Sequence, residues 1–200
     1  MKKSRVAVLV GLLCLFATTA AHAVFVDFES EASGAKANGY TVNGVTFTDT
    51  VGSGLNVDNF GAQGNGQSLA VFTDGDGSGL QMTFGGVYSK LKLDFGNDDP
   101  AWTNAGDLAL LRAFLGVNQV GQVTVVLNRD DIMNQTIGIS GVSFDNAFFA
   151  YVDPQLQPFT GTDPIGLIEI VDNIAVPEPG LLSLLGIALA GFGLARRRRA

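Results

Sequence analysis

The sequence predicts an all-β protein, an antiparallel two-sheet sandwich with a jelly-roll-like arrangement of strands. Apolar and polar residues alternate with a period of two in several short segments, the pattern of strands with one buried face. Between residues 24 and 175, 21 glycines separate these segments. About ten strands at this spacing are typical of a sandwich. The 152 residues of this stretch are enough for one domain with its own core.

The individual strands follow from local patterns. The dipeptide Asn43-Gly44 precedes alternating Val45 and Phe47, which predicts a hairpin. The clearest alternation lies in Leu80-Met82-Phe84, Leu91-Leu93-Phe95 and Val123-Val125-Leu127. Further strands are expected at Val24–Phe28, Ser68–Phe72, Ile137–Phe144, Ala147–Val152 and Leu167–Val171. The phenylalanines of this body are expected in the core.

The segment Leu108–Leu115 is compatible with either a helix or a strand. Leu108, Leu111 and Leu115 have helical spacing, whereas Leu110, Arg112 and Phe114 alternate. Because Gly116-Val117-Asn118 is typical of a turn into a following strand, a strand is the favoured interpretation.

The N-terminus has the three parts of a secretory signal peptide, which is expected to form a helix that is later removed. A basic region, an apolar region and a small-x-small cleavage site follow one another: Lys2, Lys3 and Arg5, then Val6–Phe16, then Ala21-His22-Ala23. Cleavage between Ala23 and Val24 is expected. The signal therefore predicts export.

The C-terminus combines a proline-rich turn, an apolar run and a basic end. Val176 begins the sequence Val-Pro-Glu-Pro-Gly, and Leu181–Ala195 carries no charge. As a helix this run spans roughly 22 Å, short for a hydrocarbon core of about 30 Å. We expect a short transmembrane helix whose stop-transfer arginines face the cytoplasm: Arg196, Arg197, Arg198 and Arg199. An ordinary C-terminal anchor is the alternative.

The tail resembles the PEP-CTERM sorting signal. The resemblance rests on Pro177, Glu178 and Pro179, the apolar run and the arginines, all within 25 residues of the end. It implies processing by the membrane protease exosortase in a bacterium with an exopolysaccharide system. The expected organisation is a signal peptide over 1–23, a β-sandwich over 24–175 and a sorting and anchor segment over 176–200. The body loosely resembles the sandwich modules that precede such tails, similar in style to carbohydrate-binding modules.

Composition excludes several functions for the body. Residues 24–175 hold five basic residues against eighteen acidic ones, a formal charge of −13. Such a surface repels nucleic acid and anionic lipid. Cys14 and His22, the only cysteine and histidine, lie in the signal peptide. Disulfides, thiol or imidazole metal ligands and Ser-His-Asp or Cys-His catalysis are therefore excluded after cleavage, so a metal site must use oxygen ligands, as calcium or magnesium does.

Two acidic turns are candidates for calcium. Asp74, Asp76 and Ser78 alternate with glycines, like the opening of an EF-hand loop. The twelfth position is Gly85 rather than glutamate, which excludes a helix–loop–helix site and leaves a calcium-stabilised hairpin turn or a plain Asp-Gly turn. Asn97-Asp98-Asp99-Pro100 is the second acidic turn, with the same alternatives.

Aromatic residues in exposed loops are candidates for stacking on sugar rings. Trp102, the only tryptophan, lies in a polar loop and is either a sugar-stacking residue or a lid on a sheet edge. Tyr88 and Tyr151 are weaker candidates for sugar contact. No catalytic residue is expected, since Glu29, Glu31 and Glu169 are the body's only glutamates and have no recognisable catalytic context.

The expected function is a structural or adhesive role at the cell surface or in a polysaccharide matrix, with exosortase and the secretion machinery as partners. The alternatives are a carbohydrate-binding protein and a secreted polysaccharide hydrolase.

Overall fold

The computed structural model describes residues 23–52, 54–71, 78–159 and 167–177. These contain one short 3₁₀ helix, η1 (Gly61–Gln63), and eleven strands, all paired antiparallel. The all-β antiparallel prediction is confirmed. The strands are β1 (Val24–Val26), β2 (Gly34–Lys36), β3 (Tyr40–Val42), β4 (Val45–Asp49), β5 (Leu55–Asn59), β6 (Gln67–Val71), β7 (Leu80–Gly96), β8 (Leu108–Leu115), β9 (Asn118–Val126), β10 (Gln135–Val152) and β11 (Ile170–Val176).

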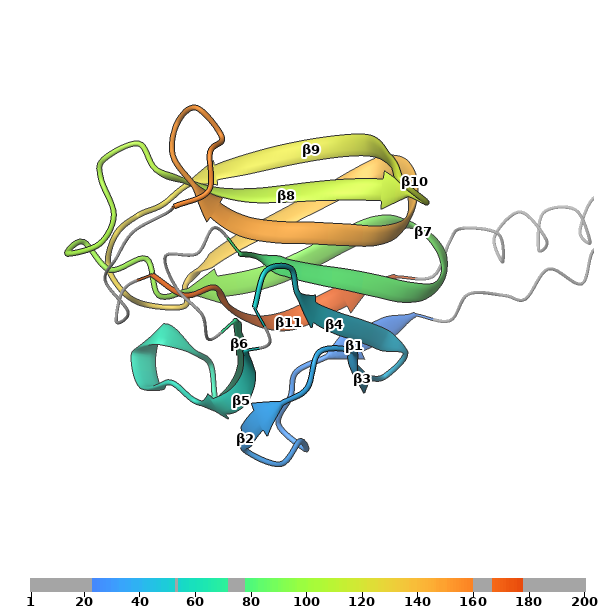
Figure 1. Cartoon of the computed structure of the whole chain (residues 1–200), viewed down its shortest axis with the longest axis horizontal. Coiled ribbons are helices and arrows are strands. Elements are labelled where there is room, and N and C mark those ends of the chain that lie inside the picture. The colour runs from blue at the N-terminus through green and yellow to red at the C-terminus, as the bar shows by residue number, and fades with distance from the viewer. Residues whose placement is uncertain (1–22, 53, 72–77, 160–166, 178–200) are drawn as a thin grey trace, which may run out of the picture.

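The sandwich is made from one folded sheet rather than two separate ones. The strand order is β2-β5-β6-β11-β7-β10-β8-β9, with β1 on β11 and the β3–β4 hairpin on β7. Figure 1 shows β8, β9 and part of β10 in one layer, over a layer that contains β6 and β11. The long strands β7 and β10 pair along their length and run through both layers, so they join the two halves covalently.

Two expected pairs of strands are single bent strands, and the expected breaks between them were wrong. Leu80–Phe84 and Leu91–Phe95 both belong to β7, and Ile137–Phe144 and Ala147–Val152 both belong to β10. Between them the β7–β10 register shifts twice, between Ser140 and Phe144 and between Phe144 and Asn146. Gly141 has a φ of 82°, which suits glycine, and Gly85-Gly86 lies in the matching part of β7. Such bulges bend a strand without ending it.

Other local predictions are confirmed or shifted. Leu108–Leu115 is the strand β8, and Asn43-Gly44 closes the β3–β4 hairpin with φ values of 49° and 83°. The expected strand Leu167–Val171 was placed too early, because β11 begins at Ile170 and continues to Val176. The short strands β2 and β5 carry no strong alternation and were not expected.

One apolar core fills the space between the layers. It contains six of the body's phenylalanines, whose rings meet in three edge-on or tilted pairs: Phe28 with Phe47, Phe84 with Phe144, and Phe95 with Phe149. The expectation that phenylalanines form the core therefore holds for these six. It does not hold for Phe25, which is half exposed on β1, or for the partly buried Phe60, Phe114, Phe148 and Phe159. A smaller apolar cluster, centred on Leu110, Ala150 and Val152, lies on the opposite face of β8 and β10.

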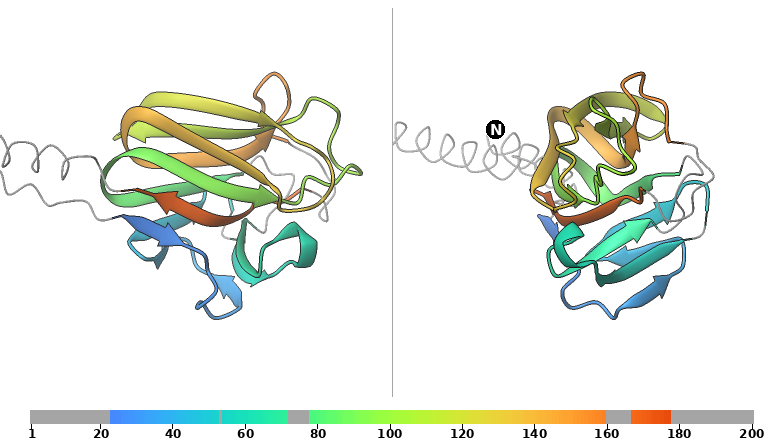
Figure 2. Two further views of the ribbon diagram at one scale, coloured as in Figure 1. Left: turned by 180° about the vertical axis from the view of Figure 1, so that it is seen from behind. Right: turned by 90° about the vertical axis from the view of Figure 1, so that its left-hand side faces the viewer.

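The first and last strands of the body are neighbours. Val24 pairs with Val176 and Val26 with Ile174, so β1 and the end of β11 lie side by side (Figure 2). The predicted cleavage point at Ala23 and Val24 is therefore next to Pro177, which follows β11 and is exposed. The expected signal helix and the tail segment Leu181–Ala195 lie outside the described residues. Within the described ranges, no helix has the length and apolar character needed to cross a membrane.

Candidate functional site

Polar side chains line up across six strands on the outer side of the sheet, away from the core. On β4, β7, β10 and β8 the alternate residues face the core, so the residues between them point outward. The register places these outward residues in two rows. One row is Thr41, Thr46, Thr83, Asn146, Phe114 and Gln119, and the other is Thr48, Gln81, Phe148, Arg112 and Gln122. We call these two rows the outer polar face.

Neighbouring side chains on the outer polar face are hydrogen-bonded to each other. The Gln81 amide Nε2 donates to Asn146 Oδ1 at 2.9 Å, and Arg112 Nε donates to Gln122 Oε1 at 3.0 Å. The Thr41 and Thr46 hydroxyls are 2.9 Å apart. Amides and hydroxyls each still offer a second donor or acceptor, so the face presents groups of both kinds to solvent. Their mutual bonds limit the rotamer entropy that binding would cost.

Two half-buried aromatic rings lie among these polar groups. Phe148 packs against the small apolar cluster on β8 and β10, and Phe114 lies in the other row. Phe148 approaches the backbone closely: a Cβ on Gly79 would lie 2.6 Å from its Cζ atom. Only glycine at position 79 therefore leaves room for the ring in this orientation.

The charge of the outer polar face differs from that of the body. The body has a formal charge of −13, yet neither row contains a carboxylate, and Arg112 is the one charged residue in them. The carboxylate of Asp145, which borders the rows, accepts hydrogen bonds from Asn146 Nδ2 at 2.7 Å and from the Gly116 N–H at 2.9 Å. A nearly uncharged face of amides, hydroxyls and two rings is suited to hydrogen-bonding and stacking with a neutral polyhydroxylated ligand. Sequence reasoning missed this face, although the polar halves of the alternating segments were its signal.

Trp102 lies elsewhere, in the loop 97–107 that leads into β8. Its ring is partly exposed at 39%, and its backbone N–H donates to the Asp99 carbonyl at 3.0 Å. The outward residues Arg112 and Phe114 belong to the far part of β8, whereas this loop lies where β8 begins (Figure 1). The structure therefore does not bring Trp102 together with the outer polar face, and sugar contact by Trp102 stays a prediction.

The second acidic turn is held by the backbone. Asp98 is buried, and its carboxylate accepts the N–H groups of Arg129 at 2.5 Å and of Asp131 at 2.9 Å. Arg129 in turn donates to Thr103 Oγ1 and to the Pro100 carbonyl. These bonds join the loop 97–107 to the loop between β9 and β10, and they give Asp98 partners without a cation.

The expected calcium turn at Asp74 and Asp76 lies outside the described residues, while Ser78 is buried at the start of the segment leading into β7. No three carboxylate, histidine or cysteine side chains of the described ranges converge in a way that could hold a metal ion.

The tyrosine candidates for sugar contact were wrong. Tyr88 and Tyr151 are both buried in the core, and the Tyr151 hydroxyl donates to the Gly96 carbonyl. Both residues lie on inward positions of long strands, where the ring contributes apolar area. The signal for this was their place in the alternation of β7 and β10.

The three glutamates of the body each accept a hydrogen bond from another group of the protein. Glu169 is buried, and its Oε1 accepts the Tyr151 backbone N–H at 3.1 Å. Glu31 accepts the hydroxyl of Tyr40, and burial together with this bond raises the pKa of Tyr40 well above its usual value. Glu29 Oε1 accepts the Gln67 backbone N–H at 3.2 Å.

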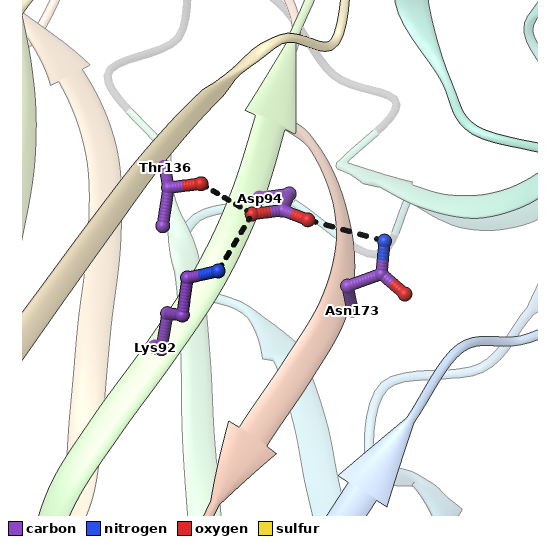
Figure 3. Close-up of polar contacts among 4 residues, drawn as sticks. All are labelled: Lys92, Asp94, Thr136 and Asn173. Atoms are coloured by element: carbon purple, nitrogen blue, oxygen red, sulfur yellow. Dashed lines mark hydrogen bonds and ion pairs between the residues drawn. The ribbon is translucent and has the colours of Figure 1, made fainter.

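A second polar group surrounds the start of β11, on the other half of the sheet. Figure 3 shows Asp94 of β7 receiving bonds from Thr136 Oγ1 at 2.5 Å and from Asn173 Nδ2 at 3.1 Å, with Lys92 Nζ at 3.8 Å. Asn173 has a φ of 50° and follows Asp172, whose two carboxylate oxygens are buried and have no hydrogen-bond partner among the described groups.

Burial raises the pKa of Asp172 to about 7, and the carboxylates of Glu29, Asp27 and Asp94 act in the same direction. The adjacent Asn173 backbone N–H lowers it, although this N–H is too poorly placed to form a hydrogen bond with either oxygen. A shift of this kind marks a carboxylate that is costly to ionise where it stands.

The fold and this face define a sandwich-like β protein with a nearly neutral hydrogen-bonding surface on an acidic body. The PEP-CTERM protein-sorting motif matches residues 175–199, so the chain carries this sorting signal at its C-terminus. A search of curated proteins found no match.

Several solved structures align with most of this chain. The arabinose-bound MgGH51 α-L-arabinofuranosidase aligns with a TM-score of 0.49 at 13% identity, over 80% of this chain and 27% of that one. This chain thus spans about a quarter of that enzyme. The CBM22-1 xylan-binding domain of Paenibacillus barcinonensis Xyn10C aligns with a TM-score of 0.45 at 12% identity, covering 81% and 97%. A DUF4465 family protein from Bacteroides caccae aligns with a TM-score of 0.42 at 12% identity, covering 79% and 100%.

Proposed function

We propose that this protein is an exported surface protein that binds a neutral polysaccharide through its outer polar face and so has an adhesive role in the cell envelope or matrix. The observation that carries the proposal is the two rows of amide, hydroxyl and aromatic side chains, free of carboxylates, on a body that is otherwise strongly acidic. Each sugar hydroxyl can pair with such a group, and the weak charge favours neutral chains over acidic ones.

The route to the surface follows from the two ends of the chain. The signal peptide starts export and is removed between Ala23 and Val24. Leu181–Ala195 then holds the body at the inner membrane as a helix, with Arg196–Arg199 on the cytoplasmic side. Exosortase processes the tail near Pro177–Pro179. The sorting motif over residues 175–199 supports this route. So does the pairing of Val24 with Val176, because the residues beside the two proposed processing points are neighbours.

Glycan binding is the first test. We expect the full chain, purified in detergent and applied to an array of polysaccharides, to bind neutral glycans and not acidic ones. Arg112→Ala and Gln81→Ala should each weaken binding about fivefold, because a lost hydrogen bond to the ligand is worth roughly 1 kcal/mol. Isothermal titration calorimetry on the best array hit measures the change.

Two matched variants locate the contact. Lys90→Ala removes a cation from the opposite half of the sheet, where Lys90 pairs with Ser140, and should leave binding unchanged. Trp102→Ala removes the exposed ring of the loop 97–107, which we call the loop end. Binding that disappears with Trp102→Ala but survives Arg112→Ala would place the contact at the loop end and refute the role of the outer polar face.

Sorting is tested by mass spectrometry of the mature protein from its own host. We expect a new N-terminus at Val24 and a C-terminus upstream of Leu181, with Glu178→Ala leaving the tail attached. A mature chain that still ends at Ala200 would contradict exosortase processing while leaving the glycan result intact.

A further inference from the structure

Asp172 is a buried carboxylate in the centre of a sheet with no group to pair with. It is 1% exposed, and neither oxygen has a hydrogen-bond partner among the described residues. Asp172 pairs in register with Asp94, on β11 between β7 and β6. A charge buried without a partner costs several kcal/mol, so folded proteins rarely keep one.

The surroundings add negative charge instead of compensating it. Three carboxylates act on Asp172: Glu29 and Asp27 from the segment after β1, and Asp94 from β7. Lys92 is the cation on this side, and its ammonium group pairs with Asp94 at 3.8 Å. No ion pair to Asp172 exists among the described residues. The electrostatic field around Asp172 is therefore negative, which favours the binding of a cation.

Glu29 can lie in this region because the nearby backbone has a glycine, Gly66, and so has no side chain to exclude the carboxylate. Its Oε1 accepts the backbone N–H of Gln67 at the start of β6. A Cβ on Gly66 would lie 1.8 Å from the same oxygen, and Gly66 has a φ of 79°. Glycine at position 66 thus lets a carboxylate from the β1 segment lie over the strand that neighbours β11.

We propose that Asp172 and Glu29 bind a divalent cation, calcium in an exported protein, which joins the segment after β1 to β11. No three acidic side chains of the described ranges converge on one point, so the other ligands are carbonyl, hydroxyl or water oxygens, which calcium accepts readily. Zinc does not fit, because the body has neither cysteine nor histidine. This site differs from the acidic loop at Asp74 and Asp76 and does not depend on glycan binding.

The cation has a structural consequence for the tail. Asp27 and Glu29 follow β1, and Asp172 lies four residues before the end of β11, which continues into the sorting motif. A shared ion would fasten the first and last strands together at the end of their pairing that is opposite to Val24 and Val176, where the chain enters and leaves the body.

Calcium-dependent stability of the full chain in detergent tests the site. After treatment with chelator, calcium added at pH 7.5 should raise the melting temperature in a saturable way, with a Kd of about 0.1–1 mM, as in extracellular modules. Asp172→Asn and Glu29→Gln should each abolish the shift. Two variants are used because either one alone could fail to fold.

Matched controls decide the outcome. Asp58→Asn, an exposed carboxylate on β5, should keep the full shift, and so should Asp74→Asn. No shift in the native chain, or a shift that survives Asp172→Asn and Glu29→Gln but is lost in Asp74→Asn, would overturn the proposal.

Discussion

Asp98→Ala should lower the free energy of unfolding by about 3–5 kcal/mol, because two partly buried backbone N–H groups lose their hydrogen bonds to a charged acceptor. Those groups belong to Arg129 and Asp131, which both have positive φ, at 62° and 60°. Non-glycine residues in this conformation each cost energy and persist only where neighbours hold them. Without the carboxylate, the loop between β9 and β10 would lose the contact that holds it there. Urea unfolding of the full chain measures the effect.

Two further variants show whether the geometry of the carboxylate matters. Asp98→Asn keeps one acceptor oxygen and should cost about half as much as alanine. Asp58→Ala removes an exposed carboxylate that bonds only the next backbone N–H, and it should cost less than about 1 kcal/mol. Equal losses for Asp98→Ala and Asp58→Ala would rule out the anchoring role of Asp98.

In the absence of calcium, stability should fall as the pH rises through the neutral range, and Asp172 is the main cause; burial also raises the pKa of Asp131, which acts in the same direction. The pKa of Asp172 is about 7 in the folded state against 3.8 without the fold, so between these values the folded chain binds more protons than the unfolded chain. Stability must then decrease with pH in this window and level off above pH 7. Between pH 5 and 8 the loss is about 2–3 kcal/mol at 1.36 kcal/mol per pKa unit.

Asp172→Asn cannot ionise and should remove most of this slope. The comparison is the difference between native chain and variant at each pH, in chelator, because the other carboxylates titrate in both and cancel. Calcium should remove most of the slope in the native chain as well, since a bound cation stabilises the ionised carboxylate. A native chain with the same pH profile as Asp172→Asn would show that this carboxylate is not the source.

Much of the fold could be predicted because its information is local. Alternation in Leu80–Phe84, the Asn43-Gly44 turn and the strand Leu108–Leu115 need only a few neighbouring residues to be recognised. The expected break between Leu80–Phe84 and Leu91–Phe95 was wrong because it too rested on local residues, the glycines at 85 and 86. They are typical of a turn, whereas here the pairing of β7 with β10 on one edge carries the strand through a bulge.

The candidate sites depend on contacts between distant segments and could not be predicted in the same way. The outer polar face exists only because the register aligns Thr48, Gln81 and Arg112 across strands that are far apart in sequence. Asp172 lies one residue beyond the expected strand Leu167–Val171, and the carboxylates around it come from residues 27, 29 and 94. Tyr151 failed as a sugar contact because its ring points inward on β10.

The pairing of β11 on both edges has a mechanical consequence for a chain that is pulled by its C-terminus. Load on the body enters through β11, which is hydrogen-bonded to β7 along one edge and to β6 and β1 along the other. A pull along this strand loads all of these bonds in shear, so they must stretch together and cannot open one after another. Forced unfolding depends on the unfolding rate. The body should therefore withstand a pull on its tail better than an equal pull that peels the edge strand β9 from β8.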